Sequence, residues 1–326
     1  MITESEKMKD IVEALRSIGE PTRLRVLALL AYGELSVGEL VDILGMSQPR
    51  LSRHMKFLTT AGLVERLPEG AWVFYRLPAT GEGRRLVDAV LPFFPFEQPE
   101  FIRDQEQLEM VKQNRSRAAE EYFNRQAESW DDVRGRHYPT EDIEAALLKI
   151  AGSGPFEFLV DLGTGTGRML TLFADRVARA EGVDISHKML TIARSNLENA
   201  GVINASVRQG DVTAPPFADG CADLVILHQV LHYLDRPERV LSEASRILKP
   251  GGRLLIVDFA PHDHEFLRAE HEHRRLGLSD DEVRQWSQIA GMTPQTPLSF
   301  ISEGKDGLTV NIWTVDKLSA NGERAA

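Results

Sequence analysis

The feature that most constrains the fold is a run of strand-forming residues that passes straight into a glycine-rich turn, FLVDLGTGTG over residues 158–167. Glycines let the backbone of such a turn approach a ligand closely, and the N-terminus of a following helix offers unpaired N–H groups. Strand patterns at 158–162, 180–184, 205–209, 223–227 and 253–258 alternate with helix patterns at 167–177, 187–199 and 237–247. This alternation predicts an α/β domain in which helices cover both faces of a parallel sheet.

The length of the chain, 326 residues, suits two domains better than one. Three prolines in the segment LPFFPFEQP, residues 91–99, indicate a boundary, and a long polar helix is expected over about 100–130. We expect a first domain at 1–91, a linker and bridging helix at 92–130, a second domain at 131–318 and a disordered tail at 319–326. The second domain is expected to end in an antiparallel hairpin formed by 300–301 and 310–315.

The first domain has the pattern of short helices followed by a hairpin. Helical stripes begin near residues 8, 21, 36 and 47, with Ser36 and Ser47 as expected N-caps and Gly45 and Gly62 as helix ends. Strands are expected at 63–67 and 72–77 around a turn at 68–70, and a further helix at 82–91. Together these elements predict a winged helix-turn-helix.

The expected third helix of this motif is basic in an otherwise acidic chain. The net charge of the whole chain is −11, yet Ser47–Arg66 holds four cations and one anion. A helix fits the major groove of double-stranded DNA, and the residues of its first turns reach the base edges. We expect base contacts from Gln48, Arg50, Ser52, Arg53 and His54, and phosphate contacts from Lys56, Arg66 and Arg76. The alternative is a winged helix used only for protein contacts.

The segments GEPTRLRVL (19–27), MSQPRLSRHMKFLTTAGLV (46–64) and WVFYRL (72–77) closely resemble ArsR-type bacterial repressors. The resemblance covers about residues 8–91 and implies a homodimer that binds operator DNA, with 8–18 and 82–91 as the expected dimer surface. Metal-sensing members carry cysteines where this chain reads LSVGE, residues 35–39. Because Ser36 and Gly38 stand there, soft-metal sensing at that position is disfavoured.

The second domain carries an ordered set of motifs around its expected strands. Asp161 precedes the glycine-rich turn, GVD ends the second strand at 182–184, and GDV follows the third at 210–212. A dinucleotide fingerprint would need glycine at position 168, where Arg168 stands. The set resembles class I S-adenosylmethionine-dependent methyltransferases that act on small molecules, over about residues 120–260. The resemblance implies a Rossmann-like fold.

The same resemblance implies a role for each matching residue. The glycines of the turn approach the methionine part of the cofactor, Asp161 helps to hold its amino group, and Asp184 takes the ribose. His228 lies beside the sulfonium and is the candidate catalytic residue, while an aromatic entrance segment contains Tyr122, Trp130 and Tyr138. The cofactor-binding set is Tyr138, Asp161, Gly163, Gly165, Gly167, Asp184, Ile185, Met189, Asp211, Val212 and His228. NAD binding and a purely structural domain are the alternatives.

Other patterns narrow the chemistry. Strand four ends in His228-Gln229 and lacks the Asn/Asp-Pro-Pro-aromatic motif of enzymes that methylate the amino groups of nucleic acids. One cysteine, Cys221, excludes an intrachain disulfide and a cysteine-cluster metal site, and disfavours arsenite methylation. The histidine-rich segment 262–273 is interpreted as a charged helix near the pocket mouth, with a general base, a substrate lid and a metal site as alternatives. No metal is expected.

Two functions fit these patterns. The first is a DNA-binding regulator, expected to be a repressor, whose methyltransferase-type domain binds S-adenosylmethionine or S-adenosylhomocysteine as effector. ArsR-type regulators of the methionine cycle that respond to S-adenosylhomocysteine have this layout, and the chain resembles them. The second is an active small-molecule methyltransferase with an autoregulatory DNA-binding domain. The polar N-terminus and the short apolar runs predict a cytoplasmic protein without a membrane partner.

Overall fold

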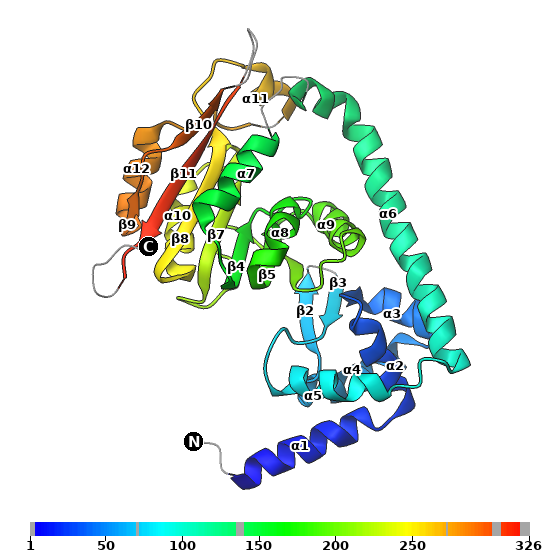
Figure 1. Ribbon diagram of the computed structural model, residues 1–326. Coiled ribbons are helices and arrows are strands. Elements are labelled where there is room, and N and C mark those ends of the chain that lie inside the picture. The colour runs from blue at the N-terminus through cyan, green and yellow to red at the C-terminus, as the bar shows by residue number, and fades with distance from the viewer. Residues whose placement is uncertain (1–3, 70–71, 135–139, 272, 302–307, 320–326) are drawn as a thin grey trace. The chain divides into compact units, whose positions relative to one another are not determined.

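The computed structural model describes residues 4–69, 72–134, 140–271, 273–301 and 308–319 (Figure 1). The chain divides into two compact units, Met1–Arg117 and Ala118–Ala326. Helix α6, Pro99–Arg134, begins in the first unit and ends in the second. Within the described residues, no helix is both long and apolar enough to cross a membrane.

The first unit is a winged helix-turn-helix. Helices α1 (Glu4–Ile18), α2 (Pro21–Leu30), α3 (Val37–Leu44) and α4 (Gln48–Thr60) are followed by the wing strands β2 (Glu65–Glu69) and β3 (Trp72–Arg76) and by α5 (Glu82–Val90). A short β1 (Leu35–Ser36) pairs with β3, giving an antiparallel sheet in the order β1-β3-β2. The wing therefore stands beside α3 and α4 on a small sheet of its own.

Local chemistry explains where the central helices start and stop. Ser36 caps α3 as expected: its hydroxyl accepts from the Glu39 N–H, and the Glu39 carboxylate accepts from the Ser36 N–H. Gly45 ends this helix in the left-handed conformation, with φ of 63°. Ser47 occupies the N-cap position of α4 but makes no side-chain capping bond, contrary to expectation. The expected turn at 68–70 is also corrected, because Pro68 and Glu69 still pair with Val73 and Trp72.

The segment expected as a linker packs, up to residue 117, onto the first unit. Phe94, Phe101 and Leu108 are buried in its hydrophobic core. Arg25 of α2 makes two hydrogen bonds of 2.6 Å to Asp104 of α6. The start of α6 is therefore a structural part of the first unit.

The second unit is an α/β domain around an eight-stranded sheet. Its strand order is β10-β11-β8-β7-β4-β5-β6, and β9 also pairs with β11. Strands β4 to β8 run parallel to one another, and the last strands are antiparallel. The strands are β4 (Phe156–Leu162), β5 (Val177–Asp184), β6 (Ala205–Gln209), β7 (Ala222–His228), β8 (Leu248–Phe259), β9 (Met292–Pro294), β10 (Leu298–Ile301) and β11 (Thr309–Lys317).

Helices cover both faces of this sheet, as Figure 1 shows. On one face α7 (Thr140–Ala151), α8 (Arg168–Phe173) and α9 (His187–Asn199) enclose one core; on the other, α10 (Pro237–Ile247) and α12 (Asp280–Ile289) enclose a second. α8 ends at Phe173, earlier than the expected 177, and a short α11 (Phe266–His271) follows β8. From β4 the strands β5 and β6 are added on one side, and β7 and β8 are added on the other side of β4, so the strand order reverses between β4 and β7. Ligands of such sheets bind at this reversal point, outside the carboxyl ends of the strands.

Candidate functional site

The glycine-rich turn leaves β4 at this reversal point and is tightly held. The N–H groups of Gly163 and Thr164 both donate to the Val183 carbonyl, at 2.7 and 2.9 Å. Gly163, Gly165 and Gly167 have φ of 79°, 52° and 79°, a region that favours glycine. A Cβ on Gly163 would lie 2.4 Å from Cγ2 of Val230, so this position requires glycine for space as well.

Asp184 joins the turn to the end of the next strand. One carboxylate oxygen accepts from the Gly165 N–H at 2.9 Å, and the other accepts from the Ser186 N–H at 2.8 Å. Gln209, at the end of β6, donates its side-chain amide to the Ile185 carbonyl at 2.9 Å. The carboxyl ends of β4, β5 and β6 are therefore bonded into one rim.

The expected adenine-binding residues lie along this rim with differing exposure. Ile185 is 71% exposed, Met189 is half-buried, and Val212 is buried. The exposed Asp211 carboxylate accepts from both the N–H and the hydroxyl of Thr213. Tyr138 lies outside the described residues, as do the side chains of Tyr122 and Trp130.

Asp161 is the buried carboxylate of the site. Thr164 donates its hydroxyl to Oδ2 at 2.6 Å, whereas the buried Oδ1 has no hydrogen-bond partner. Burial, and in smaller part the negative charge of Asp184, raise the pKa of Asp161 to about 7 against the opposing Thr164 bond. A buried, half-satisfied carboxyl group at this place fits a cationic amino group of a ligand.

His228 ends β7 on the same edge. Burial lowers the pKa of this imidazole to about 4, although the nearby Asp258 and Glu144 oppose the shift. The ring is therefore neutral near pH 7 and adds no positive charge beside a sulfonium. The next residue, Gln229, has a strained φ of 58°, and its buried Nε2 has no partner.

These residues fit S-adenosylmethionine. The open side of the turn, the unpartnered Asp161 oxygen and the neutral His228 suit, in order, the main chain, the ammonium group and the sulfonium of that cofactor. Within the described parts of the chain, no group of three or more His, Cys, Asp or Glu side chains is arranged to hold a metal ion.

A second pair of residues at this edge was missed in the sequence. His232 Nδ1 lies 2.7 Å from Asp258 Oδ1, and both side chains are buried. Asp258 Oδ2 accepts from the N–H groups of Leu231 and His232, at 3.0 and 3.3 Å. The only sequence signal was an acidic residue near the end of a strand, because the partner histidine is 26 residues away.

The residues expected to contact DNA differ in exposure. Gln48, Arg50, Ser52, Arg53, Lys56 and Arg66 are exposed. His54 is half-buried instead, with Nδ1 3.2 Å from a Glu20 carboxylate oxygen. Arg76 is paired with Glu65 at 2.8 Å and with Glu34 at 3.6 Å, so it is not free to meet phosphate.

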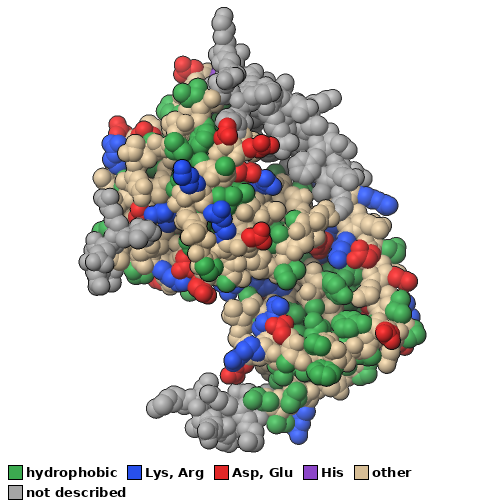
Figure 2. All heavy atoms as spheres, in the orientation of Figure 1, with side chains coloured by type: hydrophobic (Ala, Val, Ile, Leu, Met, Phe, Trp, Pro, Cys, Tyr) green, Lys and Arg blue, Asp and Glu red, His purple; other side chains and the backbone are tan. Residues whose placement is uncertain are grey.

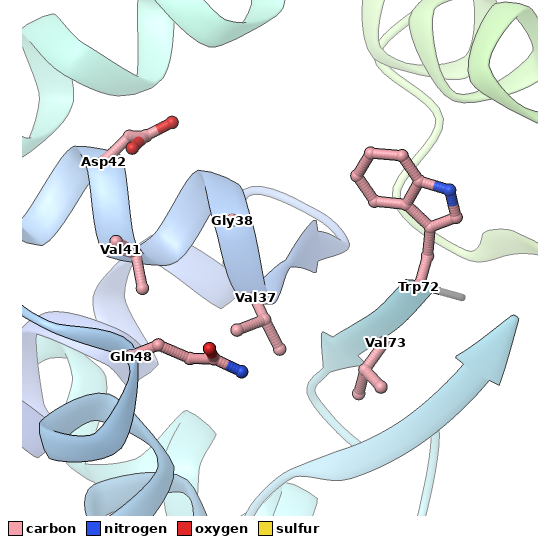
Figure 3. Close-up of a pocket in the computed structure, with 7 residues that line it drawn as sticks. All are labelled: Val37, Gly38, Val41, Asp42, Gln48, Trp72 and Val73. Carbon is pink, nitrogen blue, oxygen red and sulfur yellow. The ribbon is translucent and has the colours of Figure 1, made fainter.

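A hollow of about 340 Å³ lies between α3, the start of α4 and the wing (Figure 3). Figure 3 shows Gln48 of α4 and Val37 of α3 pointing toward one another, with Val73 of β3 facing them. The lining is Val37, Gly38, Val41, Asp42, Gln48, Trp72 and Val73. Because none of these seven residues is a cysteine or a cation, the hollow is suited neither to a soft metal nor to a phosphate.

Comparison with known proteins matches both units. Residues 20–66 match the family described as bacterial regulatory protein, arsR family, and residues 160–256 match a methyltransferase domain. A relative of the second unit is a ubiquinone/menaquinone biosynthesis C-methyltransferase UbiE of Shewanella sp. (strain ANA-3), 31% identical over 125 residues, or 37% of this chain and 50% of that protein. The chain thus spans about half the length of the curated relatives it matches.

Two solved structures have a similar second unit. One is a putative methyltransferase from Bacillus halodurans, with a TM-score of 0.49 and 20% identity over 54% of this chain and 99% of that one. The other is the YcgJ protein from Bacillus subtilis, with a TM-score of 0.48 and 20% identity over 54% and 98% of the two chains. The chain joins an ArsR-type DNA-binding domain to an S-adenosylmethionine-dependent methyltransferase domain of the class I fold.

Proposed function

We propose that this protein is a cytoplasmic transcriptional repressor that acts as a homodimer, with S-adenosylmethionine and S-adenosylhomocysteine as effectors. Helix α6 is the observation that carries the proposal. It begins inside the core of the DNA-binding unit, through Phe101 and Leu108, and continues without a break into residues of the methyltransferase unit. A change in the second unit that displaces this helix would therefore act on the first.

Arg115 supplies the step from α6 to the recognition helix. Its guanidinium donates two hydrogen bonds, of 2.9 and 2.8 Å, to the Glu39 carboxylate and one of 3.0 Å to the Glu34 carbonyl. The Glu39 carboxylate accepts from the N–H of Ser36, the N-cap of α3, and α3 packs against α4. A shift of α6 would thus alter the start of α3, and through it the helix that carries Arg50 and Arg53.

The protein can respond to the ratio of the two ligands only if they differ in their preference for the state that binds DNA. They differ by one methyl group and one positive charge, which both lie at the sulfur. Allosteric coupling of about 1–3 kcal/mol corresponds to about 5- to 150-fold in DNA affinity. Equal affinity of both ligands for both states would give no response, however tightly they bound.

The test is operator binding in three ligand states. DNA fragments that bind are first selected from the genome of origin, and fluorescence anisotropy then measures their affinity without ligand, with S-adenosylmethionine and with S-adenosylhomocysteine. We expect a 5- to 150-fold difference between at least two states. Asp161→Ala should abolish the response without changing DNA affinity in the ligand-free protein, and Arg50→Ala should weaken DNA binding in every state. Equal DNA affinity in all three states contradicts the effector role.

An active methyltransferase is the second candidate, and the His232–Asp258 pair favours it. A pure sensor needs a ligand pocket but no buried imidazole held by a carboxylate. The curated relatives carry the printed activity of C-methylation in quinone biosynthesis. Regulation and catalysis are compatible in one chain, since the effector of the first candidate is the cofactor or the product of the second.

A further inference from the structure

Among the described residues, the buried polar atoms without a hydrogen-bond partner at the carboxyl edge of the large sheet include Asp161 Oδ1, Gln229 Nε2, His232 Nε2 and His262 Nε2. Leaving such atoms unsatisfied is costly, so each indicates a group that arrives from outside. Asp161 fits the ammonium of the cofactor. The two imidazole nitrogens are acceptors or donors for something else.

The surroundings of His232 fix which of its nitrogens carries the proton. Nδ1–H donates to Asp258, whose other oxygen is held by the Leu231 and His232 N–H groups. In the neutral ring this arrangement leaves the lone pair on Nε2, and the carboxylate stabilises the imidazolium that forms when Nε2 takes a proton.

His262 is held in the opposite tautomer. Its Nδ1 accepts from the His264 N–H at 3.3 Å, so the neutral ring carries its proton on Nε2. Burial, and then the neighbouring His264 and His232 rings, lower the pKa of His262 to about 4, which keeps it neutral near pH 7. One unpartnered nitrogen is therefore a proton acceptor and the other a donor.

Aromatic rings lie near both imidazole rings. The centroid of Phe259 lies 5.4 Å from that of His232 and 6.0 Å from that of His262, and Tyr233 lies 4.1 Å from His232. Planar, unsaturated ligands pack well against such rings. The cluster adjoins the cofactor turn, because Val230, two residues before His232, fills the space above Gly163.

We propose that His232 is the general base for a methyl acceptor that carries a phenolic hydroxyl group. The hydroxyl gives its proton to His232 Nε2. The phenolate electron pair, on oxygen or on a ring carbon, then forms the new bond to the methyl group that the cofactor supplies. Where a ring carbon forms this bond, its hydrogen is afterwards lost to water as a proton, which restores the aromatic ring. The sulfonium keeps the electrons of its broken carbon–sulfur bond and leaves as a neutral thioether. The proposal depends on the cofactor pocket but not on the effector role.

The first test needs no methyl transfer. We titrate 4-nitrophenol, whose ionised form absorbs visible light, with the full-length protein at a pH below the pKa of the free phenol. We expect a saturable rise in phenolate absorbance, with and without S-adenosylhomocysteine. His232→Asn should remove the rise, since asparagine keeps a donor to Asp258 but has no basic nitrogen. The neighbouring His264→Asn is the matched control and should keep it. No rise in the wild type, or an equal rise in His232→Asn, overturns the proposal.

The second test removes the carboxylate charge. In Asp258→Asn neither orientation of the amide leaves a negative charge beside His232 Nδ1, so the imidazolium that forms on proton transfer loses its counter-ion. This variant should also lose the phenolate signal, and it decides the question if His232→Asn does not fold. With labelled S-adenosylmethionine and 1,4-naphthohydroquinone as acceptor, kcat should fall about 10²–10⁴-fold in both variants. Calorimetry with S-adenosylhomocysteine should give unchanged affinity. If the wild type does not bind S-adenosylhomocysteine, the result contradicts the proposed cofactor pocket and not the role of His232 as base.

Discussion

The carboxyl group of Asp161 should make the affinity for the cofactor depend on pH. In the free protein, burial raises the pKa of its carboxyl group to about 7, far above the ordinary value of 3.8. A bound ammonium group favours the ionised form, so binding below about pH 7 must release a proton. The affinity for S-adenosylhomocysteine should therefore fall about tenfold for each pH unit below 7. Calorimetry in two buffers of different ionisation enthalpy measures both the affinity and the released proton.

The variant Asp161→Asn gives the control. It should bind weakly at every pH, with no proton release. The raised pKa of Asp161 also affects the stability of the free protein. The folded state holds the proton of Asp161 up to about pH 7, whereas the unfolded chain releases it near pH 4, so the free energy of unfolding falls as the pH rises from about 4 to about 7. Asp161→Asn should remove that slope from the free energy of unfolding. Wild-type affinity that is constant between pH 6 and 7 would contradict the assignment of the ammonium group to Asp161.

Gly163 and Gly165 both have a positive φ but differ in the space around a new Cβ atom. In Gly163→Ala the new Cβ meets Val230 Cγ2 at 2.4 Å, in addition to a φ of 79°. In Gly165→Ala the φ of 52° is strained but no atom lies within 4 Å of the Cβ. We expect urea unfolding to show a loss of about 1 kcal/mol for Gly165→Ala and at least about 2 kcal/mol for Gly163→Ala. Val230→Ala should recover part of the second loss. Equal losses would contradict the predicted steric contact.

At the level of elements, the pair Arg115–Glu39 tests how firmly α6 is fixed to the DNA-binding unit. Arg115 is buried. Burial raises the pKa of Glu39, but the charge and hydrogen bonds of Arg115, together with the bonds from Ser36, outweigh it, so the pKa is lowered. Arg115→Met leaves that carboxylate without its cation and should cost about 2–3 kcal/mol of unfolding free energy. Arg115→Met/Glu39→Gln should recover part of this. The half-buried Lys112→Met, which loses an ion pair with Glu109 and a cation–π contact with Tyr32, should cost about 1 kcal/mol, less than Arg115→Met.

Elements differed in how far their sequences determined them. The alternation after residue 158 predicted the parallel sheet, and Ser36 with Glu39 predicted the cap of α3, because these signals are local. α7 and α12 were missed, and Ser47 occupies an N-cap position without capping. The His232–Asp258 pair depends on how the chain after β7 folds back on the end of β8, so no local pattern could distinguish His232 from His228. Similarly, only tertiary packing shows that 92–117 belongs to the first unit.

For the whole molecule, the proposed homodimer would bring the exposed cations of two recognition helices and two wings to one operator. The net charge is −11, and each copy presents Arg50, Arg53, Lys56 and Arg66. Two copies on an inverted repeat double the phosphate contacts, each of which adds about 0.9 to the salt dependence of log K. Figure 2 shows hydrophobic side chains on the surface of α1, beside the grey N-terminal residues. Ile11, Val12 and Leu15 are 52, 41 and 46% exposed there, as expected of a surface buried in a dimer.

Charges on α1 should therefore abolish dimerisation and weaken operator binding. Ile11→Asp/Leu15→Glu puts two carboxylates into the proposed apolar contact, where their desolvation is costly. Sedimentation equilibrium should show a dimer for the wild type and a monomer for the variant, and the salt slope of DNA binding should fall by about half in the variant. Ile203→Glu changes an isolated side chain, 85% exposed, in the second unit and should leave both measurements unchanged. A variant that stays dimeric would exclude α1 from the interface; a monomeric wild type with full operator affinity would contradict the doubled contact itself.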